Sequence, residues 1–173
     1  MTREDEALDP EIFLRRQPLT LYRLARARYA NLSGVGAAQY PGRWNQHGQE
    51  AIYTSTEVGV PILERLVHTP KDLIPSNLAL MTIRVAGQYE VNEENSLNIA
   101  IRDHFRLCRT LAIARKALTG FMWFAMAVPS VIVPVWNVVL YPEAPGFWDH
   151  VSLERVDPFE FDPRLFPEGT PVE

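Results

Sequence analysis

Prolines and glycines divide the apolar sequence into short segments, and this division constrains the fold more than any other feature. The chain has 14 prolines and 9 glycines among its 173 residues. Three apolar runs in the last third, 127–134, 137–141 and 151–156, are set apart by these residues. Short runs bounded by turn residues are typical of β-strands. We therefore expect a fold in which short strands dominate.

Further strands and two helices are expected in the rest of the chain. The remaining strand segments are 19–26 (LTLYRLAR), 51–55 (AIYTS) and 78–85 (LALMTIRV). One helix should begin after a cap at Ser55 or Thr56 and end near His68. A longer helix is expected over 97–118, whereas 30–50 reads as a polar, glycine-bearing loop. The predicted class is α+β, with a mixed or antiparallel sheet and helices packed against it.

Length and cysteine content suit a single domain in a reducing compartment. A chain of 173 residues can bury a core without disulfides. Cys108 is the only cysteine, which excludes an internal disulfide and suits the cytosol. No apolar run is long enough to cross a bilayer, and the acidic start lacks the apolar segment of a signal peptide. We expect a cytoplasmic protein with a flexible segment over 1–9 and one domain over 10–173.

The net charge of −4 hides an uneven distribution. Residues 1–11 and 154–173 are acidic, whereas 12–153 hold 14 basic and 10 acidic residues. Fifteen of the 17 basic residues are arginine, whose planar group binds carboxylate or phosphate through two parallel hydrogen bonds. Codon bias in a GC-rich genome explains this excess equally well. The basic residues form no clustered stripe, so we expect no direct binding of nucleic acid.

Motifs for cofactor or metal binding are weak in this chain. The segment GVGAAQ, Gly34 to Gln39, lacks the third glycine of a dinucleotide-binding fingerprint, and no helix pattern follows it. The four histidines lack the spacing of metal ligands; they are His47, His68, His104 and His150. Cys108 lies four residues after His104 on the predicted long helix, where a buried structural cysteine is the favoured interpretation. No metal site is expected.

Glu64 stands out within the shorter predicted helix. At 100° per residue, the apolar arc of this helix consists of Gly59, Ile62, Leu63, Leu66 and Val67. Glu64 lies just past the edge of that arc, close to Val60, so it should be half-buried. A lone carboxylate there is costly unless a cation or hydroxyl meets it. It is either an ordinary flanking charge or a carboxylate held over a cleft. Considered singly, Arg43, Tyr53 and Ser130 also have ordinary structural interpretations.

Taken together and in order, these segments resemble the RES domain, the toxin half of Xre/RES toxin–antitoxin pairs. The resemblance runs from LYRLA (21–25) to FDPRLF (161–166), and the predicted 10–173 domain is similar to this family. It is strongest in LSGVGAAQYPGRWNQHGQEAIYTST (32–56), in the helix glutamate, and in VPSVIVPVWNVVLYP (128–142). The resemblance implies catalytic roles for Arg43, Tyr53, Glu64 and Ser130, and substrate-binding roles for Arg23, Trp44 and Asn137.

The chain departs from the family pattern after the serine-containing strand. The family usually has asparagine-proline and then histidine-proline, where this chain has Tyr141-Pro142 and Ala144-Pro145. The family's Gly-Asp-x-x-Trp pattern is also not clear in 109–123. The roles of Tyr141 and Ala144 at the C-terminal rim of the site therefore stay open.

The resemblance implies a fold like that of ADP-ribosyltransferase toxins and NAD as the substrate, without a prosthetic group. Glu64 would face the oxocarbenium-like ribose or bond a ribose hydroxyl, and Arg43, with Arg23, would hold the pyrophosphate. Tyr53 would stack on the nicotinamide, while Ser130 would bond the nicotinamide amide or orient Tyr53.

The reaction class and the partner are also implied by the resemblance. We expect cleavage of the nicotinamide–ribose bond by water or phosphate, which depletes NAD and arrests growth. One alternative is ADP-ribosylation of a cellular protein. A second is a non-catalytic interaction module. The expected partner is an Xre-type helix-turn-helix antitoxin.

Overall fold

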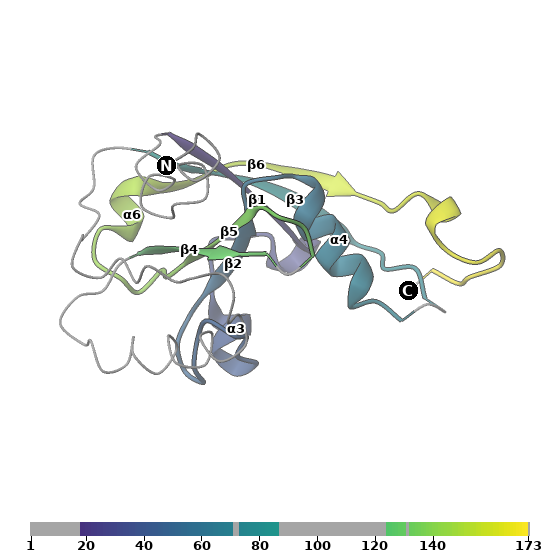
Figure 1. Ribbon diagram of the computed structural model, residues 1–173, viewed down its shortest axis with the longest axis horizontal. Helices are drawn as coiled ribbons and strands as arrows, with labels where there is room; N and C mark the ends of the chain where they lie inside the picture. The colour runs from purple at the N-terminus through teal and green to yellow at the C-terminus, as the bar shows by residue number, and fades with distance from the viewer. Residues whose placement is uncertain (1–17, 71–72, 87–123, 131, 173) are drawn as a thin grey trace.

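The computed structural model describes residues 18–70, 73–86, 124–130 and 132–172 (Figure 1). Six strands form one sheet in the order β4-β5-β2-β1-β3-β6, and all neighbouring strands run antiparallel. The strands are β1 Leu19–Arg26, β2 Ile52–Ser55, β3 Leu78–Val85, β4 Ala125–Pro129, β5 Trp136–Leu140 and β6 Val151–Phe159. The helices are η1 Ala27–Tyr29, α3 Val35–Gln39, α4 Gly59–Val67, α6 Phe147–His150 and η4 Pro163–Leu165. The α+β class and the antiparallel sheet are confirmed.

Most predicted strands lie where the sequence placed them, and the differences follow from pairing. β1 and β3 coincide with the predicted segments. β4 ends at Pro129 instead of continuing to residue 134, because the chain turns there and the Ser130 N–H donates to the Val135 carbonyl. β6 continues past the predicted end to Phe159, because β3 pairs with it along that whole length.

The start of α4 differs from the prediction. The residue preceding the helix is Val58, which offers no side-chain cap. Neither Ser55 nor Thr56 caps it, because the helix begins only at Gly59; both hydroxyls donate to the carbonyl of Trp136 in β5, at 3.4 and 3.1 Å. These polar side chains therefore tie β2 to β5. The predicted loop 30–50 contains the short helix α3, and the predicted long helix, with Cys108 and His104, lies outside the described residues, as does the segment 1–9.

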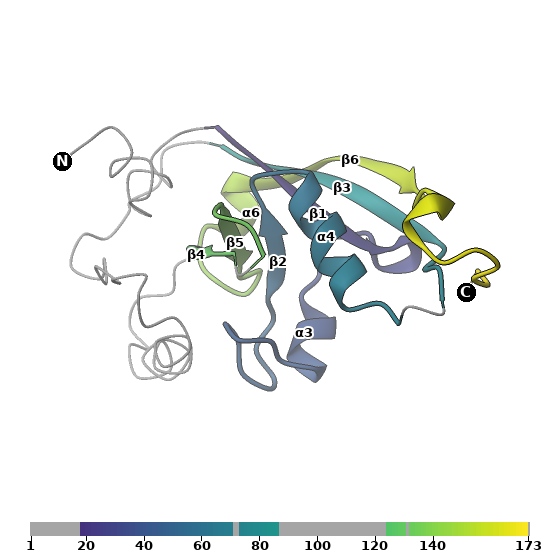
Figure 2. The ribbon, with the colours of Figure 1, turned by 45° about the vertical axis from the view of Figure 1, so that its right-hand side comes forward.

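The sheet consists of two halves that meet at a narrow junction. β1 pairs with β3 along its full length, but its ladder with β2 contains the single pair Tyr22↔Ser55. The half β4-β5-β2 therefore diverges from the half β1-β3-β6 beyond that pair (Figures 1 and 2). α4 packs against both β1 and β2 and thus covers the junction.

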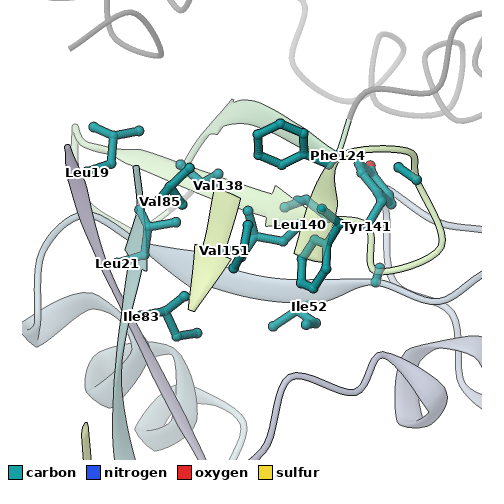
Figure 3. Packing of buried hydrophobic residues seen from close by; sticks show 14 of the residues in the cluster. Leu19, Leu21, Ile52, Ile83, Val85, Phe124, Val138, Leu140, Tyr141 and Val151 are labelled. Carbon is teal, nitrogen blue, oxygen red and sulfur yellow. The ribbon is translucent and has the colours of Figure 1, made fainter. Parts of the chain in front are cut away.

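Apolar side chains gather in two clusters. The larger cluster holds Leu21, Ile52, Ile83, Val138 and other strand residues, and Figure 3 shows their side chains converging. The smaller cluster lies under α4, where Ile62 and Leu66 pack with Leu24 and Leu78; Ile74, Phe159, Phe161 and Phe166 complete it. Burial of these residues supplies the main driving force for folding.

The buried side of α4 differs from the predicted apolar arc. Leu63 and Val67 are 40% and 66% exposed, whereas Val60 is 3% exposed. Val60, Glu64 and Ile62 lie on the part of the helix surface that faces the sheet. The predicted arc was therefore wrong for Leu63 and Val67.

None of the described helices has the length and apolar character needed to span a membrane.

Candidate active site

A row of residues crosses the sheet at the junction of its halves. Ser55 is paired with Tyr22 on β1 and with Asn137 on β5, and Asn137 is paired with Val128 on β4. Directly paired residues of antiparallel strands point to the same face. Tyr53, two residues before Ser55, points to that face as well. The face therefore presents Tyr53, Ser55 and Asn137 together beside α4.

Glu64 of α4 is held by Asn137 of β5. The Asn137 Nδ2 donates to Glu64 Oε1 at 2.8 Å, and both side chains are half-buried. A carboxylate only accepts hydrogen bonds when ionised, so this contact sets the orientation of the amide. No ion pair to Glu64 is found within the described ranges. A neutral amide thus fixes the carboxylate and leaves its charge uncompensated there.

The other end of the Asn137 amide has no hydrogen-bond partner within the described part of the chain. Its Oδ1 is buried and accepts no hydrogen bond from the described part of the chain. A buried acceptor left unpaired costs free energy, because it has lost its hydrogen bonds to water. A donor group of a bound molecule would satisfy it.

Arg43 sits on a turn whose backbone is bonded to neighbouring side chains. The N–H of Gly42 donates to Asn45 Oδ1 at 2.8 Å, and the N–H of Trp44 donates to the hydroxyl of Tyr53 at 3.0 Å. The Tyr53 hydroxyl donates in turn to Asn45 Oδ1 at 2.9 Å. The Arg43 side chain is exposed on this anchored turn.

The environment of Tyr53 keeps its hydroxyl neutral. Burial raises the pKa of Tyr53, while the bond from the Trp44 N–H and the charge of Arg43 lower it less strongly. The net direction is upward, because burial disfavours the phenolate.

Trp44, Tyr141 and Ala144 lie in the core. Trp44 is 7% exposed, so its ring packs inside the protein rather than lining an open site. The Tyr141 hydroxyl donates to the Trp44 carbonyl at 2.9 Å, and Ala144 is buried nearby in the same cluster. Tyr141 and Ala144 stand where the family usually has asparagine and histidine. Tyr141 therefore supports the turn through its bond to Trp44, and Ala144 packs in the same core cluster.

Ser130 begins the turn after β4. Its N–H donates to the Val135 carbonyl at 2.9 Å, and its hydroxyl accepts from the Ile132 N–H at 3.2 Å. Because Ser130 follows Val128 by two residues, alternation directs it to the same face as Asn137. Its hydroxyl oxygen keeps a lone pair and its proton for a further bond.

Arg23 is not brought together with Glu64. It pairs with Met81 of the larger core cluster, so alternation directs it to the face of β1 opposite Tyr22. Its Nη1 donates to the Asn31 and Ser33 carbonyls at 3.2 and 3.5 Å. Burial lowers the pKa of this guanidinium. Arg23 fastens the segment that follows β1.

Asn45 was not singled out from the sequence, yet it connects the predicted residues. It is 4% exposed and bonds Gly42, Tyr53 and three backbone carbonyls of the surrounding segment. Asparagine within a glycine-bearing turn is a weak sign of such side-chain-to-backbone bonds. Among the described residues, no group of three histidine, cysteine or acidic side chains could hold a metal ion.

Comparison with known proteins gives a family match over most of the chain. The family model described as the RES domain matches residues 20–162. A protein of Photorhabdus laumondii called Toxin Res is 33% identical over 152 residues, covering 85% of this chain and 97% of the relative. A Yersinia enterocolitica protein of the same name is 31% identical over 157 residues, covering 85% and 99%.

Two further proteins are similar. A Sphingobium protein called Prs ADP-ribosylating toxin is 27% identical over 147 residues, covering 78% of this chain and 86% of the relative. A chain in the crystal structure of the M. tuberculosis MbcT–MbcA toxin–antitoxin complex superimposes with a TM-score of 0.58. It is 20% identical and covers 86% of each chain, so it supports the fold alone.

Proposed function

Because this chain belongs to the RES-domain family of toxins, we propose that it arrests growth by breaking the nicotinamide–ribose bond of NAD. It is the toxin component of a toxin–antitoxin system. NAD is its substrate, and the reaction needs no prosthetic group. Action on the cellular NAD pool places the protein in the cytoplasm.

The observation that carries this proposal is the hydrogen bond between Asn137 and Glu64. Cleavage of the nicotinamide–ribose bond passes through a ribose with oxocarbenium character, which a nearby carboxylate stabilises. Glu64 is held at 2.8 Å by a neutral amide, with no cation to neutralise it within the described ranges. A carboxylate fixed in this way is suited to face a developing positive charge.

The remaining residues bind the two ends of the substrate. Arg43 takes the pyrophosphate through bidentate contacts, because its guanidinium is exposed on an anchored turn. The ring of Tyr53 covers the nicotinamide, since its hydroxyl already bonds Trp44 and Asn45. Asn137 Oδ1 accepts a donor of the ribose or the carboxamide, and the Ser130 hydroxyl bonds the carboxamide.

The proposed partner is an Xre-type helix-turn-helix antitoxin that blocks the site. Support comes from the structural neighbour, which was solved as a toxin–antitoxin complex. The chain itself is proposed to bind neither nucleic acid nor membrane.

The acceptor of the ribosyl group decides the exact activity. Water gives hydrolysis and phosphate gives phosphorolysis, both of which deplete free NAD. The Sphingobium relative, named an ADP-ribosylating toxin, favours transfer to a protein as the second candidate.

The test is the fate of NAD carrying a label on its adenylate phosphate. Purified chain, freed of antitoxin, is incubated with labelled NAD in buffer, in buffer with phosphate, and in buffer with a bacterial lysate. We expect free nicotinamide together with labelled ADP-ribose or its phosphate ester, and Glu64→Gln protein should form both about 10²-fold or more slowly. Label transferred to a lysate protein, with NAD stable in both buffers, would establish the transferase instead. If none of the three incubations gave a reaction, a non-catalytic interaction module would remain as the interpretation.

A further inference from the structure

We propose that Asn45, Tyr53 and Tyr141 form a clamp that positions Arg43, so that the hydroxyl of Tyr53 serves placement of the arginine rather than the chemistry. The clamp is defined as these three side chains and their bonds to the turn 42–44. Its link to catalysis rests on the proposed function, in which Arg43 binds the substrate, but its structural part stands on the contacts themselves.

Asn45 is the centre of the clamp because its amide is fully used. Its Oδ1 accepts from the Gly42 N–H and from the Tyr53 hydroxyl, at 2.8 and 2.9 Å. Its Nδ2 donates to the carbonyls of Ala37 and Gln49, at 2.8 and 2.9 Å. One buried side chain therefore fixes α3, the turn and the segment leading into β2 relative to one another. A fully satisfied buried network of this kind holds a single arrangement.

Both backbone polar groups of Trp44 are hydrogen-bonded to tyrosines from different parts of the sheet region. Its N–H donates to the hydroxyl of Tyr53 on β2, at 3.0 Å, and its carbonyl accepts from the hydroxyl of Tyr141, at 2.9 Å. Tyr141 directly follows β5 and is 2% exposed. The backbone next to Arg43 is therefore tied to the sheet from two directions.

Gly42 allows the close approach that the clamp needs. A Cβ at this position would lie 2.5 Å from the Tyr53 hydroxyl oxygen and 2.8 Å from the ring carbon that bears it. Contacts this short do not occur, so any side chain at this position would push the turn away from Tyr53. Gly36, in α3 of the same segment, has open space where its Cβ would be and serves as a matched control.

As a result, the exposed Arg43 side chain extends from a backbone turn whose neighbouring residues are fixed by hydrogen bonds. A binding group held in place before the ligand arrives loses less conformational entropy on binding. Loosening the clamp should therefore weaken substrate binding through Arg43 while the reaction step itself changes less.

The experiment measures KM and kcat for nicotinamide release in Tyr53→Phe, Tyr141→Phe and Gly42→Ala proteins. Tyr40→Phe and Gly36→Ala are the matched controls, since Tyr40 is 83% exposed on the same segment. Loss of the hydroxyl bonds in the two tyrosine variants, and the steric clash of the added Cβ in Gly42→Ala, should each raise KM about five- to tenfold, with kcat changed less. The controls should match the wild type. Each variant is then repeated in an Arg43→Ala background, where the clamp changes should add almost nothing to KM. Full, additive KM effects in that background would overturn the proposal.

A second measurement does not depend on NAD. Hydrogen exchange of the Gly42 and Trp44 amides is followed by NMR in the same folded proteins. We expect faster exchange at Trp44 in Tyr53→Phe protein and unchanged exchange in Tyr40→Phe protein. Unchanged Trp44 protection in Tyr53→Phe protein would refute the clamp, whatever the kinetics show. If the wild type released no nicotinamide, the proposed function would fail, while the exchange data would still decide whether the clamp exists.

Discussion

Among the described residues, Glu64 is held by an amide and forms no ion pair, and this decides what its removal should do. A carboxylate that balances a buried arginine stabilises the fold, and its neutralisation leaves a costly unpaired charge. Within the described residues, Glu64 instead accepts a hydrogen bond from the neutral Asn137. Its charge is therefore more useful to a bound substrate than to the folded chain alone.

We predict that Glu64→Gln protein keeps its melting temperature and its affinity for NAD. Its Oε1 can still accept from Asn137, so the local structure is retained. The kcat should fall by about 10² or more, as when one electrostatic stabiliser of a transition state is removed. Calorimetry and steady-state kinetics provide the measurements. Glu57→Gln, at an exposed position before the same helix, is the control. A large loss of thermal stability with near-normal turnover would make Glu64 an architectural charge.

Arg43 should tolerate lysine poorly, although both residues carry the same charge. A lysine ammonium cannot reproduce the two parallel bonds that a guanidinium makes to a phosphate. We predict a strong rise in KM for NAD in Arg43→Lys protein, with the melting temperature nearly unchanged because the side chain is exposed. Kinetics over a range of NAD concentrations test this. An unaltered KM would assign the phosphate contact to another residue.

Tyr53 should make the stability of the protein decrease as the pH rises in the alkaline range. Burial raises its pKa in the folded state above the value in the unfolded chain. The stabilisation from its neutral hydroxyl is thus fully present below the unfolded pKa and is lost as pH rises through the folded pKa. The melting temperature of the wild type should exceed that of Tyr53→Phe protein by a constant amount up to about pH 10, and the difference should shrink above it. Tyr40→Phe protein should follow the wild type throughout, and a constant difference at high pH would contradict the assignment.

At the scale of elements, α4 matters because it covers the point where the two halves of the sheet meet. β1 and β2 share the single pair Tyr22↔Ser55, and α4 packs against both strands. The helix thereby brings Glu64 over β5 while Ile62 and Leu66 pack on the β1 side. The position of one short helix thus determines where the carboxylate lies.

The packing of α4 predicts unequal effects for two valines on it. Val60 is 3% exposed, whereas Val67 is 66% exposed. Val60→Ala should lower the free energy of unfolding by about 1–2 kcal/mol, because two buried methyl groups are lost. Val67→Ala, the matched control, should change it by less than about 0.5 kcal/mol. Urea unfolding of both proteins measures the difference, and equal losses would show that the helix faces the sheet differently.

At the scale of the whole molecule, the site is assembled from segments far apart in sequence. Tyr141 supports the Arg43 turn from a position 97 residues beyond Trp44, and Asn137 meets Glu64 across 73 residues. Asn137 lies on β5, and Tyr53, which also bonds the Arg43 turn, lies on β2; these two strands are adjacent in the sheet order. The integrity of the β2–β5 pair is therefore a condition for the site as well as for the core.

Expression of the wild-type chain alone in bacteria should arrest growth and lower cellular NAD. Co-expression of the product of the neighbouring gene should relieve the arrest, as expected for an antitoxin that covers the site. The Glu64→Gln chain, expressed to the same level, is the control and should be harmless. Harmless expression of folded wild-type chain, with NAD levels unchanged, would count against the proposed activity.

The sequence by itself determined the elements with strong local patterns. The alternation in 19–26 and the apolar run in 78–85 predicted β1 and β3 correctly, since both are patterns of neighbouring residues along one segment. The ordered motifs around Arg43, Tyr53, Glu64 and Ser130 were sufficient to predict the family, which the match over residues 20–162 confirms. The roles of these residues stay predictions.

Only the tertiary structure decided which side of α4 is buried, where that helix begins, and what holds the site together. Ser55 and Thr56 were expected to cap the helix, but β5 offers their hydroxyls a carbonyl that the local sequence does not reveal. Asn45 was not singled out and the role of Tyr141 stayed open, because the contacts of both residues come from partners on other segments. Hydrogen bonds between distant segments depend on how the sheet brings those segments together, and a local pattern carries no record of that arrangement.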